Sequence, residues 1–228
     1  EITHGFDDRG RRYDADGKWL PLDEQSWPPD VASVKAKARS ERVYFTLTVP
    51  RKEISARGEG KPAPLILQGH GYGSNRFEGL QLAGYFAKQG FATLAIDGPS
   101  HGLGLDSIQA SLADGVFAGF GLRAMGQALL TDRALNQDND PLDTKDSAVD
   151  FWTAYLFHTR DVVRQYTLDW FQVVRTIRSF DGSARWDFDL DGDGEKELAG
   201  DFDADGVVDI GKDTELHMVG GSLGGIIS

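Results

Sequence analysis

Two short apolar runs, residues 64–68 and 91–96, limit the fold of this chain more than any other feature. Each has the length and composition of a strand buried on both faces, as the strands of a parallel sheet are. Between the runs, Asn75 can cap a helix with Glu78 as its capping partner, and Gly90 can end that helix. This order of strand, helix and strand predicts a βαβ unit with a right-handed crossover and two parallel strands.

Other segments extend this unit into an α/β fold. The β-branched and aromatic run at 43–49 predicts an early strand, and 216–219 predicts a third buried strand. The clearest helix has apolar residues on one face, namely Val162, Val163, Tyr166, Trp170, Val173, Val174 and Ile177. Together these segments predict a doubly wound, mainly parallel sheet with flanking helices.

The remaining segments suggest how the chain is divided. Residues 1–40 are polar and turn-rich, which predicts an N-terminal arm or hairpin ahead of a domain at 41–228. Within that domain, weak helical spacing at 103–157 predicts either a cap or pocket-lining excursion, or helices that simply pack on the sheet. The strongly acidic segment 187–213 predicts an insertion before the last strand.

The strand predicted at 216–219 leads into Gly220-Gly221-Ser222-Leu223-Gly224, a G-x-S-x-G pattern. In a nucleophile elbow the serine lies on a tight turn between a strand and a helix, so small residues are needed two positions before and after it. Gly220 and Gly224 occupy those positions. Because the chain has 28 glycines, a serine in an ordinary loop is the alternative interpretation of this pattern taken alone.

The order of these pieces resembles the N-terminal part of the α/β-hydrolase superfamily, and in particular of secreted lipase- or esterase-like serine hydrolases. One buried strand leads into His70-Gly71-Tyr72-Gly73, the next into residues 97–102, and the strand after the long helix into 220–224. A plain glycine turn is the alternative interpretation of 70–73.

The resemblance implies chemical roles for three residues. Ser222 is expected to be the nucleophile that forms an acyl-enzyme with a carboxylic ester. The backbone N–H groups of Tyr72 and Leu223 are expected to form the oxyanion hole. Their side chains need not take part.

The family also requires an Asp or Glu and a His after the nucleophile. Only six residues follow Ser222, and every histidine precedes it, namely His4, His70, His101, His158 and His217. We therefore expect an incomplete fold whose C-terminal strands, base and acid lie beyond residue 228, in the same chain or in a separate one. The 228 residues alone are expected to be inactive. His70 and His101 are expected to hold loops, and His217 to be a structural residue of a buried strand.

The acidic segment contains the pattern D-x-D-x-D-G-x-x-[DE] twice, 12 residues apart. Oxygen ligands at alternating positions, with a glycine at the sharp turn, suit a Ca²⁺ ion with about six to eight ligands. The pattern departs from an EF-hand and resembles the calcium loops of FG-GAP-type and dockerin-like repeats. That resemblance implies two structural ions with these ligands: Asp189, Asp191, Asp193, Glu197, Asp201, Asp203, Asp205 and Asp209. A solvated acidic linker is the alternative.

Charge and composition argue against several classes of function. Segment 187–213 contains eleven acidic residues and two lysines, so most of the net charge of −12 is local, and a nucleic-acid partner is not expected. No apolar stretch reaches the roughly 18 residues of a transmembrane helix, and no organic cofactor is expected. Calcium loops of this kind fill at the calcium concentrations found outside cells, which favours a secreted, cell-surface or periplasmic protein of a bacterium.

The expected substrate is a small-molecule or lipid ester, because the apolar residues Phe117, Phe120 and Met125 could form an acyl pocket. Peptidase, thioesterase, C–C hydrolase and cofactor-free haloperoxidase activities on the same scaffold stay open, since the fold does not choose among them. The alternative outside the enzymes is a non-catalytic calcium-binding surface module that retains a hydrolase-like core.

Overall fold

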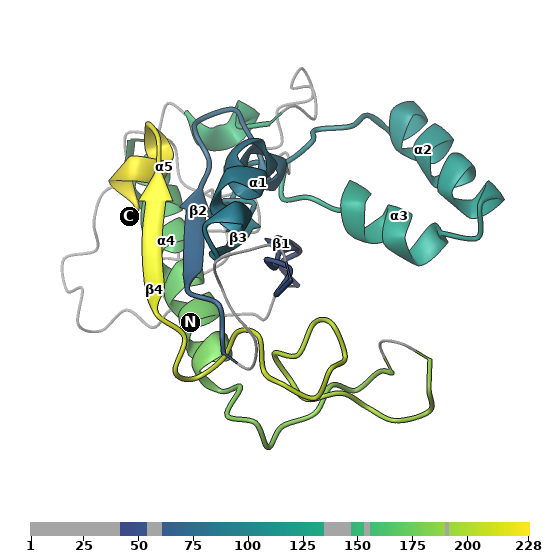
Figure 1. The fold of residues 1–228 in the computed structure, drawn as a ribbon. Helices are drawn as coiled ribbons and strands as arrows, with labels where there is room; N and C mark the ends of the chain where they lie inside the picture. Colours follow the sequence, from purple (N-terminus) through teal and green to yellow (C-terminus); the bar gives the residue numbers. More distant parts are fainter. Residues whose placement is uncertain (1–41, 54–60, 135–146, 153–155, 190–191) are drawn as a thin grey trace, which may run out of the picture. The chain divides into compact units, whose positions relative to one another are not determined.

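A computed structural model of the chain describes residues 42–53, 61–134, 147–152, 156–189 and 192–228 (Figure 1). The arm predicted at 1–40 lies outside the described residues. The chain divides into two compact units. We call the one formed by residues 45–96 and 165–228 the sheet unit, and the one that includes residues 97–164 the helical unit.

The sheet unit contains a four-stranded mixed sheet with the strand order β1-β3-β2-β4. Its strands are β1 (Phe45–Thr48), β2 (Leu65–Gly69), β3 (Ala92–Ile96) and β4 (Leu216–Gly220). β2 runs parallel to both β3 and β4, whereas β1 is antiparallel to β3. The chain is therefore α/β, and the parallel strand pair of the predicted βαβ unit is confirmed.

The two central strands are buried along their whole length, as their largely apolar composition predicts. They are connected through η3 (Arg76–Gly79) and α1 (Leu80–Lys88). The Asn75 side chain accepts a hydrogen bond from the Phe77 N–H at 3.0 Å, which confirms the predicted N-cap. The helical region thus begins with a 3₁₀ turn before it continues as an α-helix.

The predicted long helix is α4 (Leu156–Arg178). In the sheet unit it buries Tyr166 and Trp170. The Tyr166 hydroxyl donates to the Ile96 carbonyl oxygen at 3.3 Å, and its ring centroid lies 5.3 Å from that of His70. These contacts hold α4 against the carboxyl ends of β3 and β2.

The helical unit contains α2 (Ser107–Gly119), α3 (Arg123–Leu130), η4 (Val149–Phe151) and the N-terminal part of α4. α2 begins with a capping box in which the Asp106 carboxylate accepts two backbone N–H groups. α2 and α3 pack on each other so tightly that a Cβ at Gly126 would lie 2.5 Å from the Phe117 ring. The excursion predicted at 103–157 is therefore helical over much of its described part.

The prediction that residues 216–219 form a buried strand is wrong. Among the described strands, β4 pairs with β2 alone, and its residues alternate between half-buried and exposed. Val219 is 42% exposed, and the His217 side chain is 43% exposed with its Nε2 3.3 Å from the Glu215 carboxylate. His217 is therefore a surface residue of an edge strand and not a structural core residue. Apolar composition alone could not distinguish an edge strand from a central one.

Candidate functional site

Ser222 lies at the junction between β4 and α5 (Leu223–Ile226). Its backbone has φ 54° and ψ −120°, which residues other than glycine rarely adopt. The residue is exposed, and its hydroxyl caps no N–H of the helix that follows. A conformation of this kind costs about 1–3 kcal/mol and persists only where the surrounding structure imposes it. An exposed, strained serine between a strand and a helix has the local geometry of a nucleophile elbow.

The backbone packs so closely around this turn that positions 220 and 224 require glycine. A Cβ added to Gly220 would lie 2.3 Å from the carbonyl carbon of Gly224. A Cβ added to Gly224 would lie 2.1 Å from the carbonyl oxygen of Gly69. The predicted need for small residues two positions from the serine is confirmed, and its cause is contact among the ends of β2, β4 and α5.

Substituting Gly224→Ala is expected to destabilise the chain by at least about 2–3 kcal/mol, because the clash is with backbone atoms that cannot rotate away. Gly221→Ala is the matched control, since a Cβ there meets nothing within 4 Å. It is expected to change stability by less than about 0.5 kcal/mol. Urea unfolding followed by tryptophan fluorescence measures both, and equal effects would contradict this account of the turn.

The β2–β4 pairing brings the loop 70–73 beside the serine turn. Gly69 and Gly220 are register partners, so the chain leaves both parallel strands at the same edge of the sheet (Figure 1). A Cβ on Gly71 would lie 4.0 Å from the carbonyl oxygen of Gly221. The carboxyl ends of neighbouring strands are where open α/β sheets bind ligands.

Two side chains hold the loop 70–73. The Glu78 carboxylate accepts from the Gly71 N–H at 3.0 Å, instead of completing the capping box predicted with Asn75. His70 is buried, with its Nδ1 2.8 Å from the Gly71 carbonyl oxygen and its ring against Tyr166. His70 therefore holds the loop, as predicted, and Glu78 is a further residue that does so.

The two predicted oxyanion donors belong to these neighbouring turns. Leu223 is the first residue of α5, and its side chain is buried. In the described part of the chain, its N–H donates to no acceptor. Tyr72 follows Gly71 in the loop, and its side chain is 49% exposed. The sheet register thus brings together the segments that contain the proposed nucleophile and both proposed donors, whose roles stay predictions.

The other residues proposed around the site have different surroundings. His101 is buried in the helical unit, where its Nδ1 lies 2.8 Å from the Pro99 carbonyl oxygen, so it holds a loop as expected. Phe120 and Met125 are 77% and 48% exposed, and the acyl pocket proposed around them stays a prediction. His4 lies outside the described residues.

The two acidic repeats form loops 189–197 and 201–209, and the described residues of the first, all but 190 and 191, match those of the second. In each loop the first aspartate accepts from the N–H of the glycine at position 6, at 2.8 Å. In each, the aspartate at position 5 accepts from the N–H of position 7, at 2.7 Å in the first loop and 2.9 Å in the second. Positions 4 and 6 have positive φ in both loops, even though Ala204 stands at position 4 of the second. The sequence repeat is therefore a structural repeat.

Each loop gathers three carboxylates whose oxygen atoms lie within 4.8 Å of one another. The groups are Asp189, Asp193 and Glu197 in the first loop, and Asp201, Asp203 and Asp205 in the second. This spacing suits one cation with ligand distances of about 2.3–2.6 Å. Both clusters could therefore hold a metal ion. Asp191 lies outside the described residues.

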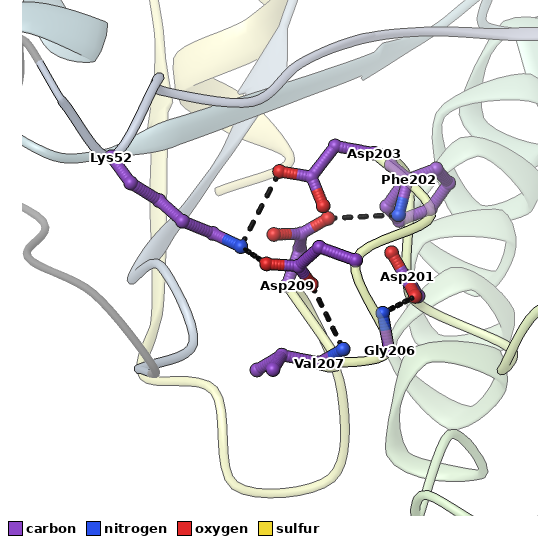
Figure 2. A network of polar contacts seen from close by, with 8 residues as sticks. Lys52, Asp201, Phe202, Asp203, Gly206, Val207 and Asp209 are labelled. Atoms are coloured by element: carbon purple, nitrogen blue, oxygen red, sulfur yellow. Dashed lines mark hydrogen bonds and ion pairs between the residues drawn. The ribbon is translucent and has the colours of Figure 1, made fainter.

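The second loop fits a cation best, because one of its carboxylate oxygens is buried without a partner. Asp201 is 1% exposed, and its Oδ2 accepts from the Gly206 N–H. Its Oδ1 has no hydrogen-bond partner. An unpaired buried carboxylate oxygen is costly, and a bound cation would offset that cost. Asp209 is fully buried, and its Oδ2 accepts from the Phe202 N–H at 2.8 Å (Figure 2).

A small aromatic cluster anchors the acidic segment. The Trp186 ring packs against three neighbouring rings, those of Phe180, Phe188 and Phe202. Its Nε1 donates to the Asp201 carbonyl oxygen at 3.2 Å. The first ligand position of the second loop is therefore tied to a packed cluster, which a solvated acidic linker would not have.

Lys52 is the residue of this site that the sequence did not indicate. Its ammonium contacts the Asp205 carboxylate and lies 3.4 Å from Oδ2 of Asp203 (Figure 2). Its side chain is only 10% exposed. Because 153 positions separate Lys52 from Asp205, no local pattern could have revealed this contact.

Comparisons with models of known protein families, with curated proteins and with solved structures each find no match. The assignment of a function therefore depends on the geometry of the chain itself. In the described ranges, no helix combines the length and the hydrophobicity needed to cross a membrane.

Proposed function

We propose that this chain is part of a serine hydrolase that acts on carboxylic esters, with Ser222 as the nucleophile. One observation carries the proposal, namely the strained, exposed backbone of Ser222 between β4 and α5. The glycine packing around it gives a physical reason for keeping the strain, because the close approach of backbone segments leaves no room for a Cβ at positions 220 and 224. Strained residues of this kind cluster at active sites.

The proposed reaction is acyl transfer. The Ser222 Oγ attacks the ester carbonyl carbon while a general base takes its proton, and the carbonyl oxygen becomes an oxyanion. The N–H groups of Leu223 and Tyr72 stabilise that oxyanion, and each donor is worth about 3–4 kcal/mol of the barrier. The alcohol leaves, and water then hydrolyses the acyl-enzyme. On the resemblance to the α/β-hydrolases, the proposed histidine base and its acidic partner would come after residue 228.

The parallel sheet supports this assignment beyond the serine itself. β2 and β4 are neighbours and end in register, so the turns that follow them lie side by side. Glu78 and His70 fix the loop that contains Tyr72. A small-molecule or lipid ester is the proposed substrate class, with peptide and thioester substrates as the alternatives on the same site.

A fluorophosphonate reagent tests the proposal, because it reacts with serines whose hydroxyl is activated by a base. The test uses the natural full-length protein, since the proposed base follows residue 228. Labelling is expected at Ser222. An inert Ser222 would favour the alternative, a non-catalytic calcium-binding surface module with a hydrolase-like core.

We also propose that loops 189–197 and 201–209 bind calcium as a structural ion. The buried, unpartnered Oδ1 of Asp201 and the matching hydrogen bonds of the two loops support this. Oxygen ligands alone suit a hard cation, and an irregular set of carboxylates suits Ca²⁺ better than Mg²⁺. Because such loops fill at extracellular calcium concentrations, the proposed location of the protein is outside the cytoplasm of a bacterium.

A further inference from the structure

The side chain of Lys52 contacts two of the three carboxylates that could hold a cation in loop 201–209. Lys52 follows β1 by four positions, and its side chain is 10% exposed. The ammonium contacts the Asp205 carboxylate and lies 3.4 Å from Oδ2 of Asp203. Figure 2 shows the Lys52 side chain extending toward Asp203 from a segment outside the loop.

The lysine and a metal ion require the same oxygen atoms. Asp203 and Asp205 belong, with Asp201, to the three carboxylates whose oxygens lie within 4.8 Å of one another. Oδ1 of Asp205 already accepts from the Val207 N–H at 2.9 Å, and Lys52 occupies its Oδ2. An ion held by all three carboxylates would therefore lie close to the ammonium, and like charges at that distance repel.

We propose that the Lys52 ammonium and a divalent cation are alternative occupants of loop 201–209. The lysine is a tethered monovalent cation that neutralises part of the loop when no ion is bound. A calcium ion carries twice the charge and can also bind the buried Oδ1 of Asp201. Binding of the ion therefore releases Lys52 and the segment after β1 from the loop. This inference depends on the calcium site proposed for the same loop.

The competition has a measurable consequence. An ion that must displace the lysine binds with an apparent Kd equal to its intrinsic Kd divided by the fraction of loops that the lysine leaves free. Two partly exposed ion pairs of this type are modest in strength. Removing the lysine is therefore expected to tighten calcium binding by about 3- to 30-fold.

Isothermal titration of the natural full-length protein with calcium chloride tests this expectation. An Asp193→Asn background removes the contribution of loop 189–197, so that the second loop is measured alone. In that background, Lys52→Met is expected to bind calcium about 3- to 30-fold more tightly. Lys212→Met is the matched control, because it removes the same charge from an exposed position just after the loop. It is expected to change the Kd for calcium by less than about twofold.

Chemical labelling of lysine tests the same inference without any substitution. In the calcium-free chain, Lys52 is expected to react slowly with an amine acylating reagent because it is shielded by the aspartates. Saturating calcium is expected to speed its modification at least about threefold, as reciprocal linkage requires, while Lys212 keeps its rate. Mass spectrometry of the digested chain gives both rates in one experiment.

The possible results distinguish a failure of the competition between Lys52 and calcium from a failure of the calcium site itself. If the unsubstituted chain binds no calcium, the calcium site is wrong and the competition is wrong with it. If calcium binds but Lys52→Met leaves the affinity unchanged or weaker, or calcium leaves the labelling of Lys52 unchanged, then only the competition is wrong.

Discussion

Substituting Ser222→Ala is expected to lower the kcat of the full-length protein for a p-nitrophenyl ester by at least about 10⁴-fold. The alanine has no oxygen to form the acyl-enzyme, so only the oxyanion donors and substrate binding remain to accelerate the reaction. Serine and alanine both carry a Cβ at this position, so the substitution adds no backbone clash, and the turn between β4 and α5 is expected to survive. The measurement is release of p-nitrophenolate at saturating substrate.

Ser179→Ala is the control for this loss of activity. Ser179 is an exposed serine just after α4, and its Oγ donates to the Thr176 carbonyl oxygen at 2.6 Å. Its replacement is expected to leave kcat within about twofold, because a surface substitution away from a site is close to neutral. Retention of most of the activity by Ser222→Ala would show that another residue carries the chemistry.

Chelation of calcium is expected to lower the midpoint of thermal unfolding by about 5–10 °C for each filled loop. An ion present at 100 times its Kd stabilises the folded state by about 2.7 kcal/mol. For a chain of this size, each kcal/mol shifts Tm by about 2–4 °C. The physical cause is the local charge, since segment 187–213 carries eleven acidic residues that repel one another unless cations offset them.

Two controls show which loop causes this shift in Tm and which ion it requires. Asp201→Asn is expected to abolish the part of the shift that comes from the second loop, because the buried Oδ1 is its best-placed ligand atom. Magnesium is expected to restore little of the lost stability, since it demands smaller and more regular coordination. An unchanged Tm in the presence of chelator, with calcium known to have been bound beforehand, would rule out a structural role for the ion.

The parts of the fold that could be predicted are those determined by local composition. β2 and β3 are buried on both faces, and their short, largely apolar runs predicted this directly. α4 was predictable because its apolar spacing continues over several turns. The glycines at 220 and 224 were predictable because the close approach of backbones leaves no alternative residue.

The parts that could not be predicted depend on neighbours distant in the sequence. β4 has the apolar composition of a central strand, yet its residues are partly exposed because it pairs with β2 alone among the described strands. Glu78 is close enough in sequence to Asn75 to suggest a capping box, but it binds the Gly71 N–H instead. Lys52 reaches the acidic loop from 153 positions away, where no motif could indicate it.

The site at which a fluorophosphonate attaches to the natural full-length protein tests directly whether Ser222 is the nucleophile. The reagent loses fluoride and forms a phosphonate ester with an activated serine oxygen, which mass spectrometry locates after digestion. A single modification is expected, at Ser222, and none is expected in the Ser222→Ala variant. A catalytically active protein that is modified at another serine, or that is not modified at all, would contradict this assignment.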